Sequence, residues 1–158
     1  MTETGLLRGL DAGAAIEEGR GQALTKADFE ALADFRYRLR RFLRFSEEVT
    51  HSQGITPLQY QLLLHIKGFP GRDWATVGEL AERLQAKHHG AVSLISRCEQ
   101  LGLVRRVPSA SDRRRVEVHL SPEGERCVAH LAHLHRNELL SLQGRFTTPE
   151  VKSFTDER

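Results

Sequence analysis

Apolar residues recur every three or four positions between residues 25 and 54, the spacing of one face of an α-helix. Thr25 and Asp28 precede this run as a capping-box pair with Asp in place of Glu, so we expect the helix to begin there. Thr56, followed by proline and then by glutamine at the third helical position, is the expected N-cap of a second helix. Residues 25–67 are therefore predicted to form two consecutive helices.

Turn-forming residues at 68–73 interrupt the helical pattern, and Trp74–Ala75 is predicted to be a short strand. Residues 76–79 read Thr-Val-Gly-Glu, a capping box that opens a short third helix. A fourth helix is predicted from about residue 88 to residue 101, because Gly102 suits the left-handed backbone at a helix end. The third and fourth helices are nearly contiguous.

Two short β-branched segments, residues 103–107 and 116–120, are predicted to pair as a hairpin around the polar turn at 108–112. One face of the second segment carries Val116, Val118 and Leu120. Helix, turn, helix and hairpin in this order make a winged helix-turn-helix, which presents its second helix to the major groove of DNA. The predicted fold class is mainly α with a small β-hairpin wing.

Further segments flank this unit. Residues 1–24 are rich in Gly and Ala with weak periodicity, so we expect a loosely ordered arm. Ser121 and Pro122 open a fifth helix, and Thr148–Glu150 opens a short sixth. The apolar side of the fifth helix is expected to carry Val128, Leu131, Leu134 and Leu139 or Leu140.

The predicted helix at 88–101 has two chemically different faces. Its buried stripe is expected to be Ala91, Leu94, Ile95, Cys98 and Leu101. The outward side carries His89, Ser93, Ser96 and Gln100, flanked by His88 and Arg97. These polar side chains can donate to or accept from base edges, and arginine pairs with phosphate or guanine. A merely solvated face is the alternative, but the adjoining hairpin favours base reading.

The formal net charge is only +2, but its distribution along the chain is uneven. Residues 87–120 contain seven lysines and arginines against three acidic residues, which leaves +4 in this segment. Arg113–Arg115 stand at the protruding turn, where three like charges repel one another without benefit to folding. We expect the turn to contact phosphates or a minor groove, with Asp112 accepting a bidentate hydrogen bond from a neighbouring guanidinium.

Other classes of protein are not favoured. No apolar run approaches the roughly 18 residues of a membrane span, and Met1–Arg20 does not read as a secretory signal, so we expect a cytoplasmic protein. The sequence contains no glycine-rich phosphate loop, nucleophile elbow or zinc-protease signature. We therefore expect neither catalysis nor a cofactor.

Four motifs resemble the MarR family of bacterial winged-helix regulators, over about Thr56 to Leu131. They are Ile55–Tyr60 at the second helix, Val77–Leu84 at the third, Glu99–Arg106 at the helix-to-wing junction, and the wing signature Ser111–Arg115 followed by Val118–Gly124. The resemblance implies a regulator of transcription, in most relatives a repressor. It also implies a homodimer whose first, fifth and sixth helices interlock, with recognition helices about one duplex turn apart on a palindrome.

Together with the residue pattern, the resemblance predicts how the chain divides into segments and which residues contact DNA. The segments are a loosely ordered arm at 1–24, a dimerisation helix at 25–54, the DNA-binding domain at 55–120 and C-terminal dimerisation helices at 121–158. The residues expected to contact DNA are Lys87, His88, His89, Val92, Ser93, Arg97, Asp112, Arg113, Arg114 and Arg115. Val92 lies at the edge of the buried stripe, within reach of a thymine methyl. Lys87 stands where relatives often have a capping serine, and Gly90 is unfavourable in a first turn.

Relatives commonly release DNA when a small aromatic or anionic molecule binds between the dimerisation helices and the winged domain. Candidate effector residues are Arg36, Arg40, Phe42, Phe45, Tyr60 and His65, which combine cationic and aromatic groups. The alternative is that the aromatic residues are core and the arginines are solvated, and we favour this alternative.

Three rival interpretations remain. His130, His133 and His135 suggest a metal sensor, although no acidic or cysteine partner lies at ligand spacing and no metal site is expected. A peroxide sensor needs an activated thiolate, which neither Cys98 nor Cys127 is placed to provide. A winged helix can also serve protein–protein docking, but such a wing does not need several arginines.

Overall fold

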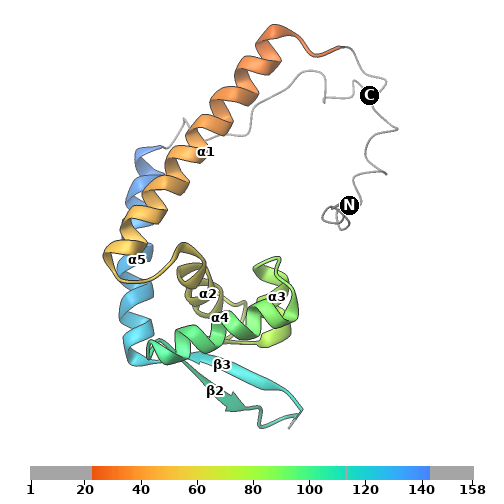
Figure 1. Ribbon diagram of the computed structural model, residues 1–158, viewed down its shortest axis with the longest axis vertical. Helices are drawn as coiled ribbons and strands as arrows, with labels where there is room; N and C mark the ends of the chain where they lie inside the picture. The colour runs from red at the N-terminus through yellow and green to blue at the C-terminus, as the bar shows by residue number, and fades with distance from the viewer. Residues whose placement is uncertain (1–22, 113, 143–158) are drawn as a thin grey trace, which may run out of the picture. The chain divides into compact units, whose positions relative to one another are not determined.

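The computed structural model describes residues 23–112 and 114–142. The chain divides into two units, one formed by Met1–Tyr37 and Thr147–Arg158 and the other by Arg38–Phe146. The predicted arm at 1–24, apart from its last two residues, and the predicted sixth helix lie outside the described residues. Figure 1 shows helices joined to a small sheet, as the predicted fold class requires.

Helix α1 spans Lys26–Ser52 and begins at the predicted cap. The Asp28 carboxylate accepts hydrogen bonds from the backbone N–H and the hydroxyl of Thr25, both at 2.8 Å. At the other end, Gly54 adopts φ +73° and turns the chain out of the helix. The Asp-for-Glu capping box therefore works as the sequence predicts.

Helices α2 (Pro57–Lys67) and α3 (Val77–Arg83) both start with complete capping boxes. In α2, Gln59 accepts the Thr56 backbone N–H at 2.8 Å, and its own N–H donates to the Thr56 hydroxyl at 3.2 Å. In α3, Glu79 and Thr76 form the same pair of contacts at 2.8 and 3.4 Å. Both predicted helix starts are confirmed.

The sheet has three antiparallel strands in the order β1-β3-β2: β1 is Trp74–Thr76, β2 is Val104–Pro108 and β3 is Val116–Leu120. The central strand places His119 between Trp74 and Arg105, and Val118 between Ala75 and Arg106. Alternation along the strands therefore puts these two rows on opposite faces. Ala75 and Val118 are fully buried.

The core lies between this sheet and the helices, which include α4 (His88–Gln100) and α5 (Pro122–Ser141). Its fully buried large side chains include Leu62, Leu63, Ile66, Leu80, Ile95, Val118 and Leu131. The start of α5 is joined closely to the start of the hairpin, because the Ser121 N–H donates to Leu103 O at 3.0 Å. A Cβ on Gly124 would lie 2.0 Å from the same oxygen, so only glycine allows this contact.

Several predicted core positions are exposed. Leu101 is 49% exposed, because it is the C-cap residue of α4 and the helix ends there instead of continuing over the core. Val116 is also exposed, since it pairs with Pro108 at the outer end of the hairpin. Leu139 and Leu140, at the last turns of α5, are both about half exposed. The remaining predicted stripe of α4 is buried.

Candidate nucleic-acid interface

The outward face of α4 follows from its buried stripe. Ala91, Ile95 and Cys98 are fully buried, which turns the opposite side of the helix to solvent. The exposed side chains on that side are His88, His89, Val92, Ser93, Arg97 and Gln100. The Arg97 Nε donates to Ser93 O at 3.4 Å, so its guanidinium lies back along the helix. Apart from Ser96, the face predicted from helical periodicity is the exposed one.

The start of α4 differs from the starts of its neighbours. Lys87 is the N-cap, and its side chain makes no capping hydrogen bond. Gln85 in the preceding turn has φ +51°, and the Ala86 N–H donates to Ala81 O at 2.9 Å. This tight turn fixes the direction in which α4 leaves α3. The sequence carries no glycine or asparagine at 85 that would have predicted the left-handed geometry.

The described part of the wing tip is basic and exposed, and Arg113 lies outside the described residues. The Arg115 Nε lies 3.6 Å from an Asp112 carboxylate oxygen, and the Arg115 side chain is 69% exposed. The other Asp112 oxygen accepts the Arg114 backbone N–H at 3.0 Å. Among the described arginines of the tip, Arg115 therefore makes a single longer contact to Asp112 and not the expected bidentate bond. Asp112 shapes the turn and holds Arg115 by a longer ion pair.

A second arginine, Arg106 on β2, ties the wing to α4. Its guanidinium pairs with Glu99 at 2.5 Å and donates to the Ser96 hydroxyl at 2.9 Å and to Val92 O at 3.2 Å. Ser96, predicted to be free for base reading, is instead a half-buried partner of Arg106. The row of Arg106, Val118 and Ala75 faces the core side, which explains why this arginine meets α4.

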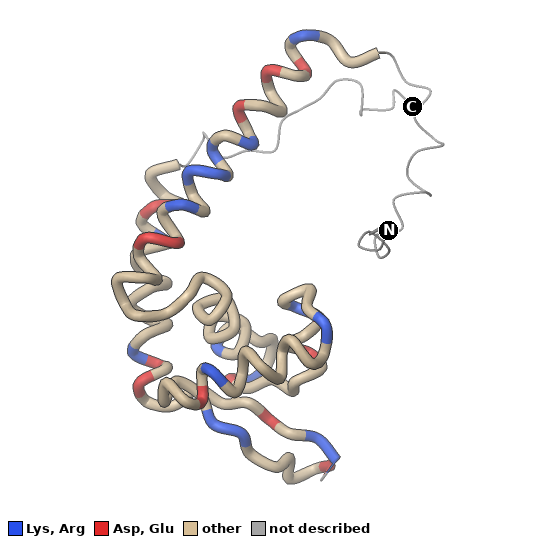
Figure 2. The backbone as a smooth tube through the Cα atoms, in the orientation of Figure 1, with Lys and Arg blue, Asp and Glu red and all other residues tan. Residues whose placement is uncertain are grey.

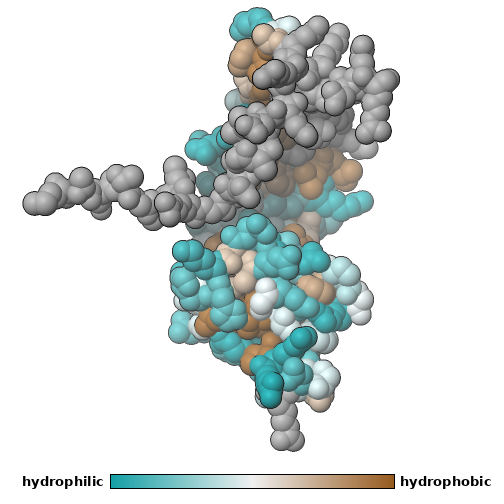
Figure 3. Space-filling model, turned by 90° about the vertical axis from the view of Figure 1, so that its right-hand side faces the viewer, coloured by the Kyte–Doolittle hydropathy of each residue, from teal (hydrophilic) through white to brown (hydrophobic). Residues whose placement is uncertain are grey.

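Figure 2 shows basic residues on β2 and near the wing tip, with acidic residues between them. The space-filling view shows a largely hydrophilic surface interrupted by small apolar patches over the winged helix. On the face seen in Figure 3, the apolar patches over the described part of the winged helix are separated by hydrophilic residues. A polar surface with clustered arginines is typical of a duplex-binding face.

The predicted effector residues do not all come together. Phe42 and Tyr60 line a cavity of about 540 Å³ between α1, α2 and α5. Phe45 contacts the ring of His135, which also lines that cavity. Arg40 lies on a different side of α1, and Arg36 belongs to the other unit. His65 is half-buried on α2, where burial and the charge of Arg83 lower its pKa.

His135 is one of the cavity residues that were not among the predicted effector residues. It is buried, its Nε2 lies 2.8 Å from the Ser46 hydroxyl, and its Nδ1 lies 2.7 Å from Leu131 O. Its ring stacks on Tyr60 with centroids 4.4 Å apart. Its position four residues after Leu131 and seven after Val128 is the signal that places it on the core side of α5.

The metal and peroxide interpretations gain no support from the geometry. His130 and His133 are exposed on α5, whereas His135 is buried. Across the described residues, no three His, Cys, Asp or Glu side chains are grouped to hold a metal ion. Burial raises the pKa of Cys98 to about 11 and also raises that of Cys127, which opposes formation of a reactive thiolate.

The fold and its exposed basic face define the class of the molecule, a winged helix-turn-helix that binds DNA. Residues 53–115 match the model of the MarR family. The winged-helix part of the chain is therefore similar to the MarR family, and the relatives that match the chain over most of its length are described as transcriptional regulators. Within the described residues, no helix has the length and apolarity needed to cross a membrane.

The similarity to individual proteins extends beyond the winged helix. An uncharacterized HTH-type transcriptional regulator, YsmB of Bacillus subtilis (strain 168), is 29% identical over 144 residues, covering 85% of this chain and 87% of that protein. AbsC, a MarR family transcriptional regulator from Streptomyces coelicolor, has a TM-score of 0.68 at 23% identity over 82% of this chain and 86% of its own. A mutant of S. aureus MepR bound to an oligodeoxyribonucleotide has a TM-score of 0.59 at 20% identity, over 72% and 81%.

Proposed function

We propose that this regulator is a homodimeric repressor that binds a palindromic operator, with α4 in the major groove and the wing at the minor groove. The proposal rests on one observation: the two parts proposed to face DNA, helix α4 and the wing, are bonded to each other. The exposed face of α4 and the wing arginines belong to one unit, in which Arg106 bonds strand β2 to α4. A relative of similar fold has been solved with an oligodeoxyribonucleotide, which supports this mode of docking.

The exposed side chains suggest a division of labour. His88, His89 and Ser93 are short enough to read base edges, Val92 can contact a thymine methyl, and Arg97 can pair with guanine or phosphate. Lys87 and the arginines at 113–115 are assigned to phosphates or to a narrow minor groove. Asp112 is assigned to the turn that presents these arginines. Sequence preference should therefore depend on α4, and general affinity on the tip.

Homodimerisation is proposed through segments 25–54 and 121–158. Leu43, Leu139 and Leu140 are each close to half exposed in the single chain, although leucine is a typical core residue. Burial against a second copy would remove this apolar surface from water, at about 25 cal/mol per Å². Two-fold symmetry would then place two copies of α4 on the two halves of a palindrome.

The cavity beside His135 is proposed as the effector site. Its walls combine the rings of Phe42, Tyr60 and His135 with the guanidinium-bearing Arg136, which suits a small aromatic acid. Such a ligand, binding more tightly to the form that does not fit the operator, would release DNA. The bound dimer would repress transcription by blocking access to the duplex. Most members of the family that the sequence resembles are repressors.

Selection of bound sites from a random duplex library tests the proposal most directly. We expect an enriched palindrome whose half-sites lie about one helical turn apart. His89→Ala and Ser93→Ala should change the enriched sequence while leaving affinity for random duplex nearly constant. An asymmetric single site would contradict the homodimer, and a binding constant independent of salt would contradict duplex binding and favour protein docking.

A further inference from the structure

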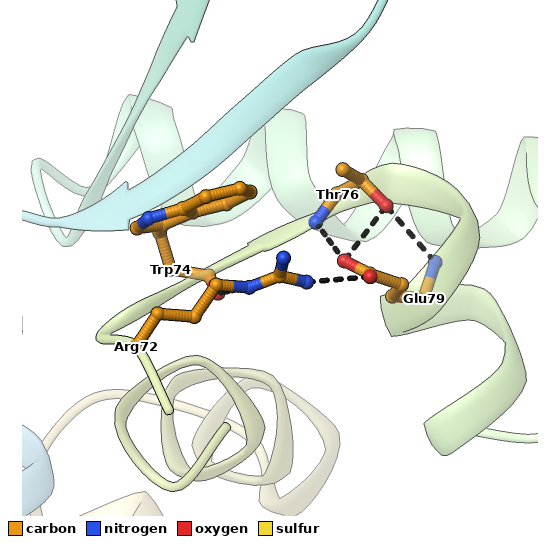
Figure 4. A network of polar contacts seen from close by, with 4 residues as sticks. All are labelled: Arg72, Trp74, Thr76 and Glu79. Carbon is orange, nitrogen blue, oxygen red and sulfur yellow. Dashed lines mark hydrogen bonds and ion pairs between the residues drawn. The ribbon is translucent and has the colours of Figure 1, made fainter. Parts of the chain in front are cut away.

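Arg72, in the loop between α2 and β1, has its guanidinium over two aromatic rings. Its Cζ lies 3.9 Å from the centroid of the Trp74 ring and 4.3 Å from that of Phe69. Its Nε donates to Trp74 O at 3.0 Å, and its Nη2 lies 2.5 Å from Glu79 Oε1 (Figure 4). The side chain is only 28% exposed. Little of this cation is left to meet a ligand.

The partner of Arg72, Glu79, also caps α3. While one carboxylate oxygen pairs with Arg72, the other accepts the backbone N–H and the hydroxyl of Thr76, as Figure 4 shows. Burial disfavours ionisation of Glu79, but the hydrogen bonds from Thr76 and Arg72 outweigh it and lower its pKa. One ionised side chain therefore joins the loop before β1 to the first helix of the helix-turn-helix.

The capping box of α2 shows that capping does not require this charge. Gln59 occupies the position equivalent to Glu79 and makes the same backbone contact at 2.8 Å. A neutral amide therefore completes the box in this chain. The carboxylate of Glu79 adds the ion pair with Arg72, and the cap would persist without it.

The other side of the stack reaches the wing. Trp74 is paired in register with His119 of β3, and their rings stack with centroids 6.0 Å apart. His119 Nε2 lies 2.9 Å from the carboxylate of Glu117, on the same strand. Thus Glu79, Arg72, Trp74 and His119 form a continuous series of contacts from α3 to the central strand of the wing.

We propose that Arg72 is a positioning residue for DNA binding, which fixes the wing-bearing sheet to α3 so that wing and recognition helix meet the duplex in one geometry. The inference rests on the DNA-docking mode proposed above. A five-residue strand is about 17 Å long, so a tilt of about 10° at its base would move the tip by about 3 Å. A displacement of that size removes a hydrogen bond to a phosphate.

The test compares Arg72→Gln and Glu79→Gln in the full chain, with the double variant. Binding to a random 30-base-pair duplex is measured over a series of salt concentrations, together with thermal unfolding and amide hydrogen exchange. Glu79→Gln keeps a capping box of the kind seen in α2, so it should fold even if Arg72→Gln does not. We expect affinity to fall about fivefold in each variant and no further in the double variant, because both break one contact.

Two further readouts separate positioning from other roles. The salt slope should remain that of the unaltered chain, because Arg72 touches no phosphate in this arrangement. Amides of β1 and β3 should exchange faster in both variants, because the strands are less firmly held to α3. The matched controls are Arg126→Gln on α5 and Glu82→Gln on α3, which remove the same charges from exposed positions.

Four results would overturn the inference. A slope reduced by about 0.9 would make Arg72 a phosphate contact. A lower unfolding temperature with unchanged affinity would make its role one of stability alone. Additive losses in the double variant, or unchanged exchange in β1 and β3, would show that no such contact holds the wing. Failure of the unaltered chain to bind duplex at any salt would instead contradict the proposed function, since the exchange measurement needs no DNA.

Discussion

The base and the tip of the wing use arginine in opposite ways. At the base, Arg72 and Arg106 are only 28% and 27% exposed, and each is paired with a glutamate of a neighbouring helix. At the tip, Arg115 is 69% exposed and pairs only loosely with Asp112. A count of charges along the sequence treats these arginines alike. The surroundings of Arg72 and Arg106 show that they hold neighbouring elements together, whereas the exposed arginines of the tip are proposed to contact the duplex.

The largest expected effect comes from the tip. Replacing Arg114 and Arg115 together with alanine should weaken binding to random duplex by about tenfold per arginine at low salt, because charge-assisted bonds to phosphate are lost. The slope of log affinity against log salt should fall by about 0.9 for each lost contact. Titration by fluorescence anisotropy measures both, with Arg126→Ala as the control for loss of charge alone. An unchanged slope would mean that the tip does not reach the phosphates.

At the base, Arg106→Met should reduce folding stability more than it reduces DNA affinity. The change removes the ion pair with Glu99 and the bonds to Ser96 and Val92 O, while the backbone N–H of residue 106 still donates to Glu99; the loss should lower the free energy of unfolding by about 1 kcal/mol. The matched control is Arg105→Met, an exposed neighbour on the same strand. Urea denaturation measures both. Equal destabilisation by the two changes would show that Arg106, on the core-facing side of β2, contributes no more to stability than the exposed Arg105.

Acid should reduce the folding stability that Glu79 contributes at the base of the wing. Because the folded-state pKa of Glu79 lies below its ordinary value of 4.5, the ionised carboxylate favours the folded chain above that pH. This contribution is lost as pH falls from about 4.5 through the lower folded-state pKa. Glu79→Gln should therefore flatten the loss of stability in that window, measured by urea denaturation at successive pH values. Parallel curves for the two proteins would show that Glu79 contributes no such dependence.

The smallest effect is expected at Asp112. Asp112→Asn retains an oxygen for the Arg114 N–H and removes the ion pair with Arg115. Loss of one negative charge beside the phosphates should raise affinity for random duplex by less than about threefold, since exposed ion pairs contribute little. A marked fall in affinity would instead show that Asp112 orients Arg115 for binding.

Local sequence signals predicted most of the fold. Residues such as Thr25, Thr56 and Thr76 cap helices through hydrogen bonds to the side chain of the residue three positions later, so the local sequence is enough to find them. Alternation and turn residues likewise located the hairpin. Leu101 was misplaced because periodicity does not tell where the core stops beneath a helix.

The helix face of the candidate interface could be predicted from the sequence. The side-chain contacts that hold this helix and the wing in place could not. Arg106 meets Ser96 across ten positions and Arg72 meets Glu79 across seven, in both cases between different elements. His135 meets Ser46 across eighty-nine positions. Such pairs depend on how elements pack, which the order of residues does not reveal without the structure.

The close contact at Gly124 predicts which substitutions a genetic screen would recover. A side chain at this position would collide with Leu103 O, and relief of the collision would move α5 away from the first residues of the hairpin. A screen for loss of regulation should therefore recover substitutions at Gly124 among those at the duplex-facing positions. Such a mutant would keep every side chain that is proposed to contact DNA and yet behave as a null allele.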